Sequence, residues 1–174
     1  MSEHTLSVKL ENKAGALARV SQLFSRRGYN IQSLAVGPTE HADISALTLR
    51  VDCSEHSLEQ IEKQMHKLVN VLRVIELRAD DSVERELALI TVATSPERRA
   101  DLIALSQVAG AQVADIGRDA ITFEIVGRPE QLEAFEELVR PYGVRELVRT
   151  GRIGVRRPSA SRRLTNQPAL IRTT

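Results

Sequence analysis

The chain has 174 residues, 42% of them apolar and 27% charged, and its formal net charge is +1. This length suits one ordinary domain or two small ones with a buried core. Scarce aromatic residues argue against a nucleic-acid platform of stacked rings, and the single cysteine, Cys53, excludes an internal disulfide and a cysteine-built zinc site. Without a charged-then-apolar leader or a membrane-length apolar run, we expect a cytoplasmic protein that makes no membrane contact.

The first half of the chain predicts the element order βαββαβ. Residues 6–10 alternate apolar with polar side chains, as in a strand with one buried face. Residues 17–24 carry apolar side chains at helical spacing, and Gly28 after two arginines is typical of a helix end. Ser57 and Gln60 resemble a capping box at the start of a second helix. The remaining periodic segments predict strands at 31–36, 44–51 and 72–77 and a helix at 58–68.

The second half repeats this order after a polar break at Asp80, Asp81 and Ser82. Pro96 suits the first position of a helix. The other segments predict strands at 87–92, 112–116, 121–125 and 144–148, the last able to continue to residue 155, and a helix at 132–139. Two split βαβ units describe the chain. We therefore predict an α+β fold of two ferredoxin-like βαββαβ domains, residues 1–79 and 80–155, with antiparallel sheets and helices on one face.

Residues 156–174 differ in composition from the rest of the chain. They hold five arginines and no acidic side chain, and serine, threonine and proline are frequent. Such a segment buries too little apolar surface to fold by itself. We expect a disordered basic tail, either simply solvated or in contact with an acidic partner such as a nucleic acid.

A sheet with helices on one face leaves its other face uncovered. Val36 and Ile44 lie in apolar surroundings on the predicted strands, so both faces of the sheet need cover. Side-by-side pairing of sheet edges between two copies, which also removes an open edge, is one solution, and face-to-face stacking is another. Either predicts a homo-oligomer, and a twofold dimer is the commonest closed form.

The loop at residues 10–17, between the first strand and the first helix, is the candidate ligand site. The first four N–H groups of a helix have no internal acceptor and attract anions. Gly15 lacks a β-carbon, so a ligand can approach the backbone closely. The side-chain amides of Asn12 and Asn30 can bind a carboxylate or an ammonium group. This arrangement suits a free amino acid, and Ile31, Leu34 or Val36 could contact its side chain.

A purely structural role for the same residues stays open, since Asn12 could be a loop or helix-cap residue, Gly15 a turn glycine and Asn30 a turn residue. No spacing of histidines, cysteine or carboxylates supports a catalytic group or a metal site, and we expect neither. The sequence therefore indicates a sensor rather than a catalyst.

Specific runs of residues resemble a known family. The order of elements, with Glu11-Asn12-Lys13-Ala14-Gly15-Ala16-Leu17 between first strand and first helix, resembles an ACT domain, an amino-acid-sensing module. Longer runs resemble the small regulatory subunit of acetohydroxyacid synthase (AHAS, or acetolactate synthase), and they lie at 17–20, 23–31, 33–34, 58–64, 66–74 and 83–87. The likeness is specific over residues 4–90, looser to 155, and absent from the tail.

The resemblance implies a partner and a ligand. In that family the chain has no cofactor of its own and binds a catalytic large subunit, which carries thiamine diphosphate, FAD and magnesium and joins two 2-oxo acids. The small subunit raises that activity and confers feedback inhibition in branched-chain amino acid biosynthesis, usually by valine, with leucine and isoleucine as alternatives. The ACT domains pair in a homodimer, and the amino acid lies between them.

Carried over to this sequence, the family site places Asn12 and Gly15 of one subunit against Asn30 and Ile31 of the other. The loop residues Lys13, Ala14 and Ala16 complete the predicted site, and Gln60 is a further candidate. Two other interpretations stay open: a free-standing, amino-acid-responsive ACT protein with a different partner, and a small enzyme on a ferredoxin-like scaffold.

Overall fold

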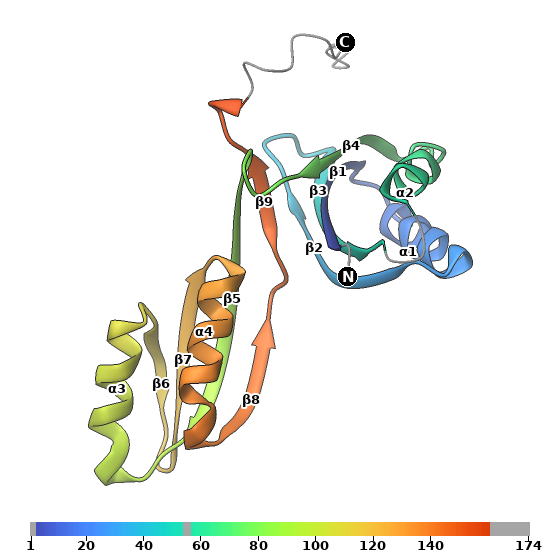
Figure 1. Cartoon of the computed structure of the whole chain (residues 1–174). Coiled ribbons are helices and arrows are strands. Elements are labelled where there is room, and N and C mark those ends of the chain that lie inside the picture. Colours follow the sequence, from blue (N-terminus) through green and yellow to red (C-terminus); the bar gives the residue numbers. More distant parts are fainter. Residues whose placement is uncertain (1–2, 54–56, 161–174) are drawn as a thin grey trace.

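The computed structural model describes residues 3–53 and 57–160, which form two α+β units with helices on one face of each sheet (Figure 1). This confirms the predicted fold class. The first unit has strand order β2-β3-β1-β4, and all neighbouring strands are antiparallel. Its elements are β1 (Glu3–Glu11), α1 (Ala16–Arg27), β2 (Asn30–Pro38), β3 (Ile44–Asp52), α2 (Leu58–Met65) and β4 (Val71–Leu77).

Local signals in the sequence explain where the helices of the first unit begin and end. Gly28 closes α1 in a left-handed conformation (φ 68°), and its N–H donates to the carbonyls of Phe24 and Ser25. Ser57 caps α2, because its Oγ accepts the Gln60 N–H at 3.3 Å. That bond is half of the predicted capping box.

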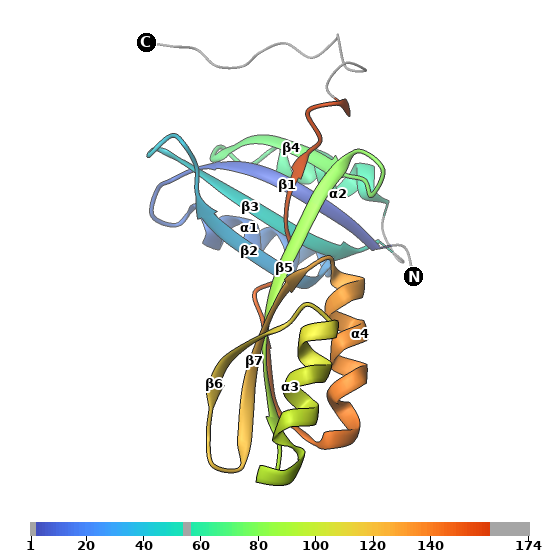
Figure 2. The ribbon, with the colours of Figure 1, turned by 90° about the vertical axis from the view of Figure 1, so that its left-hand side faces the viewer.

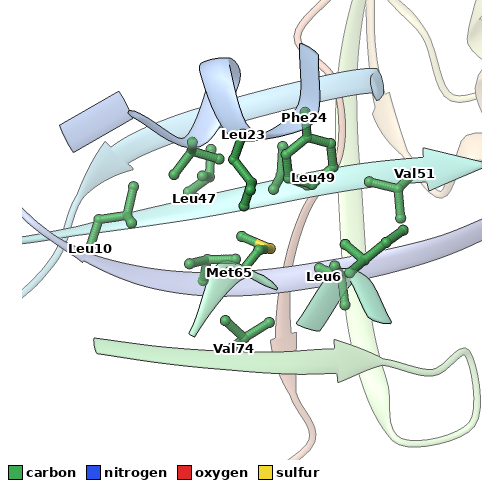
Figure 3. Close-up of a cluster of buried hydrophobic side chains, with 12 residues drawn as sticks. Leu6, Leu10, Leu23, Phe24, Leu47, Leu49, Val51, Met65 and Val74 are labelled. Carbon is green, nitrogen blue, oxygen red and sulfur yellow. The ribbon is translucent and has the colours of Figure 1, made fainter. Parts of the chain in front are cut away.

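The core of the first unit lies between the sheet and its two helices (Figure 3). Alternate residues of β1 and β3 meet the apolar stripes of α1 and α2, as their periodicity predicts. Phe24 also meets the Tyr29 ring edge-on, with centroids 5.6 Å apart. The buried side chains are Leu6, Val8, Leu10, Val20, Leu23, Phe24, Leu47, Leu49, Val51, Ile61, Met65 and Val74.

The second unit has strand order β6-β7-β5-β8, and a further strand, β9, pairs with β5 alone. Its core centres on Phe123 and Phe135, whose rings meet edge-on at 5.8 Å. A single 3₁₀ turn at Pro96–Arg98 precedes the first helix, where the sequence places the helix start. The elements are β5 (Ser82–Ala93), α3 (Arg99–Val108), β6 (Gln112–Ile116), β7 (Ala120–Gly127), α4 (Pro129–Val139), β8 (Val144–Arg149) and β9 (Ile153–Arg156).

The long strand β5 pairs with β7 along one edge and with two successive strands, β8 and β9, along the other. Its second half pairs with β8, while Ser82–Arg85 pairs with β9, beyond a corner at residues 150–152 (Figure 1). The last predicted strand therefore becomes two strands. Order also extends past the predicted boundary at 155, because Arg156 ends β9 and the Arg157 N–H donates to the Asp81 carbonyl at 2.8 Å. The rest of the predicted tail, residues 161–174, lies outside the described residues.

The face of the first sheet away from α1 and α2 is partly covered by the chain itself. β9 lies against β3 and β4 on that face (Figures 1 and 2). Thr5, Thr48 and Leu77, which alternate with the core positions of their strands, are at most 7% exposed there. Part of the cover that the sequence assigned to a second copy thus comes from the same polypeptide.

Candidate functional site

A hollow of about 260 Å³ lies where β1 meets α1, next to the end of β2 and the start of β3. We call it the helix-start hollow. Three of the predicted site residues, Asn12, Lys13 and Ala16, contribute to its wall. The full lining is Leu10, Glu11, Asn12, Lys13, Ala16, Leu17, Val36, Gly37 and Ser45.

Gly15 shapes the entrance to α1. It occupies the N-cap position in a left-handed conformation (φ 82°), which residues with a β-carbon rarely adopt. Apart from its chain neighbours, no described residue has an atom within 4 Å of where a β-carbon would stand, so the space beside it is open. A ligand can therefore approach the backbone here, as the sequence predicts.

The helix start offers fewer amide donors than expected, but it does offer some. The Ala16 N–H, a predicted ligand donor, is used within a turn, donating to the Lys13 carbonyl at 3.1 Å. Among the described residues, no acceptor faces the N–H groups of Gly15, Leu17 and Ala18. Unpaired donors at the positive end of a helix dipole form a site for an anion such as a carboxylate.

Asn12 has a structural role as well as a place in the hollow. Its Nδ2 donates to the Ala42 carbonyl at 2.9 Å, and its backbone N–H donates to the Asp43 carbonyl at 2.7 Å. These bonds hold the β2–β3 turn against the loop. One side-chain proton and the Oδ1 atom remain for a ligand, so the structural and ligand-binding interpretations are compatible.

A polar network on the rim of the hollow was not found from the sequence. The Glu11 carboxylate accepts from Asn70 Nδ2 at 2.7 Å and from Lys13 Nζ at 3.2 Å, while Asn70 Oδ1 accepts from Arg19 at 2.9 Å. These bonds, that from Asn70 foremost and then that from Lys13, lower the pKa of Glu11 below 4.5. Asn70 lies 59 residues from Glu11, so no local pattern signals the contact.

Asn70→Ala is expected to raise the pKa of Glu11 back toward 4.5, because it removes the strongest bond to the ionised carboxylate. Since the pKa is lowered in the folded state, this network stabilises the fold above about pH 4.5 and loses that effect as pH falls through the lowered value. Carbon-13 NMR titration of the Glu11 carboxyl measures its pKa in the wild type and in the variant. Lys13→Gln should give a smaller rise, and an unshifted Glu11 in Asn70→Ala would contradict the assignment.

The structure does not bring the other predicted residues to the hollow of the same chain. Asn30 pairs with Asp52, at the opposite end of the β2–β3 ladder from Gly37. Ile31 packs against the core of the first unit, and Gln60 lies in the first turn of α2. Ala14 and Gly15 adjoin the hollow in sequence but do not line it.

Residues 3–53 and 57–160 contain neither a candidate metal cluster nor a membrane-spanning helix. No cluster of three or more His, Cys, Asp or Glu side chains there could hold a metal ion. No helix in the same ranges has the length and apolar character needed to cross a bilayer.

Comparison with known proteins places this geometry in a family. Residues 6–73 match the family model "AHAS small subunit-like ACT domain", and residues 85–158 match "Small subunit of acetolactate synthase". An acetolactate synthase small subunit from Mycolicibacterium smegmatis is 49% identical over 88% of this chain and 91% of that protein. A probable one from Archaeoglobus fulgidus is 43% identical over 88% and 96%. The crystal structure of the small subunit from Thermotoga maritima superimposes with a TM-score of 0.82 at 36% identity, covering 90% and 98%.

Proposed function

Because the chain belongs to the acetolactate synthase small subunit family and is thus a regulatory subunit, we propose that it senses a branched-chain amino acid. It acts in the cytoplasm on a catalytic large subunit, raising its activity and making it sensitive to valine, leucine or isoleucine. The chain is itself non-catalytic, and thiamine diphosphate, FAD and magnesium belong to the large subunit. The observation that carries the proposal is the helix-start hollow beside unpaired helix amides.

The hollow matches the parts of a small aliphatic amino acid. A ligand carboxylate can accept from the Leu17 and Ala18 amides, where the helix dipole favours negative charge. The Asn12 Oδ1 can accept from the ammonium group. The side chains of Leu17 and Val36, which are 36% and 49% exposed, offer apolar surface for a branched side chain to cover.

A homodimer through β2 accounts for the predicted residues that lie elsewhere in the chain. β2 is an edge strand of its sheet, and open edges favour pairing with another strand. Full antiparallel overlap of Asn30–Pro38 with its copy pairs position 30 with 38 and position 31 with 37. Asn30 and Ile31 of the partner subunit would then lie beside Gly37, which lines the hollow. The site is thus completed across a twofold axis.

The expected energies suit sensing rather than storage. Micromolar to millimolar affinity for a ligand this small corresponds to about −8 to −4 kcal/mol. A coupling free energy of about 1–3 kcal/mol between ligand and large subunit would change affinity roughly 5- to 150-fold. By linkage, binding of the large subunit must alter valine affinity by the same factor.

Reconstitution with the cognate large subunit tests the function. We expect the isolated chain to show no turnover of 2-oxo acids. The mixture should be more active than the large subunit alone, and valine should lower the activity of the mixture several-fold. Calorimetric titration of the isolated chain with valine, leucine and isoleucine ranks the ligands. Failure to stimulate the large subunit would favour a different partner, and turnover by the chain alone would favour an enzyme.

A further inference from the structure

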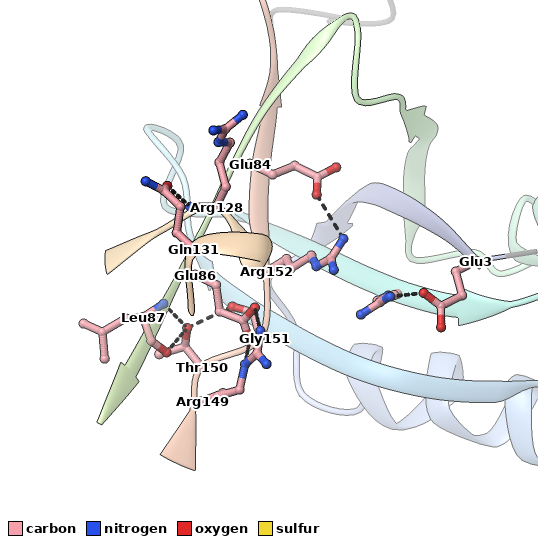
Figure 4. A network of polar contacts seen from close by, with 11 residues as sticks. Glu3, Glu84, Glu86, Leu87, Arg128, Gln131, Arg149, Thr150, Gly151 and Arg152 are labelled. Atoms are coloured by element: carbon pink, nitrogen blue, oxygen red, sulfur yellow. Dashed lines mark hydrogen bonds and ion pairs between the residues drawn. The ribbon is translucent and has the colours of Figure 1, made fainter. Parts of the chain in front are cut away.

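The two units meet through a corner between β8 and β9, residues 150–152, which we call the corner turn. It rests on residues 32–34 of β2, and a second hollow of about 360 Å³, the junction hollow, lies between them (Figure 4). β2 is also the strand that begins with the predicted ligand residues Asn30 and Ile31. The corner turn therefore touches the strand of the proposed amino-acid site.

Gly151 makes this contact at backbone distance. It is buried and left-handed (φ 77°), and a β-carbon placed on it would lie 3.3 Å from Ser33 Cβ and 3.6 Å from the Leu34 N atom. Contacts of 3.3 Å between a β-carbon and its neighbours force the neighbour to shift by a few tenths of an ångström. The backbone of the corner turn thus packs directly against β2, with no long side chain between them to absorb a displacement.

β2 is irregular at the point of contact. Its register with β3 shifts between Ile31 and Ser33, which leaves Gln32 without a β3 partner. The Gln32 side chain donates to the Glu3 carboxylate at 2.7 Å, and Glu3 also pairs with Arg50 of β3. Such irregularities redirect side chains and change the local twist. A ligand that moves Asn30 and Ile31 would therefore move the segment that faces Gly151.

The other side of the corner turn is firmly tied to the second unit. The Thr150 N–H donates to the Leu87 carbonyl at 3.0 Å, and the Leu87 N–H donates to Thr150 Oγ1 at 3.1 Å. Arg149 binds the buried Glu86 carboxylate through two bonds of 2.9 and 2.8 Å (Figure 4). A displacement of Gly151 is thus transmitted to β5, the central strand that contributes to the core of the second unit.

In the described part of the chain, no ion pair bridges the two units at the junction hollow. Among the described residues, the ion pairs around the junction hollow stay within one unit: Glu3 with Arg50, Glu86 with Arg149, and Glu84 with Arg152. Burial first, and the Arg152 charge second, lower the pKa of Arg50, while the carboxylates of Glu133 and Glu86 in the second unit oppose that lowering. The Gly151 contact lies beside the packing of β9 on the first sheet, where Gly154 approaches Leu77, and these contacts hold the two units together.

We propose that the corner turn senses the position of the β2 irregularity through Gly151 and Ser33, and so transmits occupancy of the amino-acid site to the second unit. This inference rests on the proposed function, because the ligand is the one assigned there. It identifies the Ser33–Gly151 contact as a positioning element for regulation, in addition to any change in dimer geometry.

Hydrogen exchange of the full-length chain tests the link, first without ligand. Gly151→Ala forces the contact, and Gly110→Ala is its matched control, because Gly110 has the same φ of 77° and, chain neighbours aside, no described residue within 4 Å of a β-carbon. Amide exchange in residues 30–38 should rise about tenfold in Gly151→Ala and stay unchanged in Gly110→Ala. Equal exchange in both variants would overturn the proposal, whether or not valine binds.

Ser33→Gly provides a compensation test. Alone it opens a gap at the contact and should also raise exchange in residues 30–38. Combined with Gly151→Ala, the new β-carbon fills that gap, and exchange should return to within about twofold of wild type. Strain in the corner turn alone would not be relieved by a change on β2, so additive single effects would count against the proposal.

Valine completes the test. In wild type, saturating valine should slow exchange in residues 30–38 and in 149–153, whereas in Gly151→Ala only the first segment should be protected. Protection of both segments in Gly151→Ala would refute transmission through this contact. If valine protects neither segment in wild type while the ligand-free contrast persists, the amino-acid site is refuted and the mechanical link between the units is supported.

Discussion

Gly15→Asp should abolish inhibition by the branched-chain amino acid while leaving the chain folded. The new carboxylate would stand beside the unpaired amides of Leu17 and Ala18, where the ligand carboxylate is expected, and would repel it. Space is available, since among the residues that the structure describes only the chain neighbours of Gly15 come within 4 Å of the added β-carbon. The left-handed φ of 82° costs about 1–2 kcal/mol. We expect valine affinity to fall at least about 100-fold, or about 3 kcal/mol.

Calorimetric titration of the isolated chain measures this loss directly. Gly15→Ala is the matched control, because it carries the same backbone strain without the charge and should retain most of the affinity. Stimulation of the large subunit should survive in both variants, which separates loss of sensing from loss of the fold. Valine affinity unchanged in Gly15→Asp would remove the site from this end of α1.

Glu86→Ala should be the most destabilising single change near the junction of the two units. Glu86 is 5% exposed and forms a two-bond pair with Arg149, whose pKa it raises mainly through those hydrogen bonds. Truncation leaves a half-buried cation without its partner, and breaking such pairs costs about 3 kcal/mol. Urea unfolding followed by circular dichroism measures the change in the free energy of unfolding.

An exposed pair provides the comparison. Glu136 and Arg140 also meet at 2.8 Å, four residues apart on one helical turn, but the arginine side chain is 68% exposed. Glu136→Ala should therefore cost only about 0.5 kcal/mol. Replacing both Glu86 and Arg149 with apolar residues should recover much of the lost stability, because no charge is then left unpaired. A loss below about 1 kcal/mol in Glu86→Ala would show that Arg149 finds another partner.

Much of the fold could be predicted because its signals are local. Alternation along β1, the helical stripe of α1 and the glycine at position 28 each act within a few residues. The division of the last strand was missed because Val144–Arg149 and Ile153–Arg156 are both suited to extended structure. Their separation depends on Gly151, whose conformation and contact with Ser33 involve another unit of the molecule.

The candidate site divides in the same way. The sequence could predict Asn12, Lys13 and Ala16 because they are near neighbours in the chain, and all three line one hollow. Asn70 could not be predicted, since it reaches Glu11 only after α2 returns the chain to the sheet. The sequence predicts that the Ala16 N–H binds the ligand, but in the structure this N–H donates to the Lys13 carbonyl within a turn.

By itself the sequence determined most of the elements and their order, the family and the candidate ligand loop, because periodicity, caps and short motifs act between near neighbours. The tertiary structure alone decided which strand covers the first sheet, which amides remain unpaired and where the two units touch. Those outcomes depend on contacts between residues far apart in the chain, such as Thr150 with Leu87, 63 positions away. Such contacts exist only once loop closure has brought the strands together.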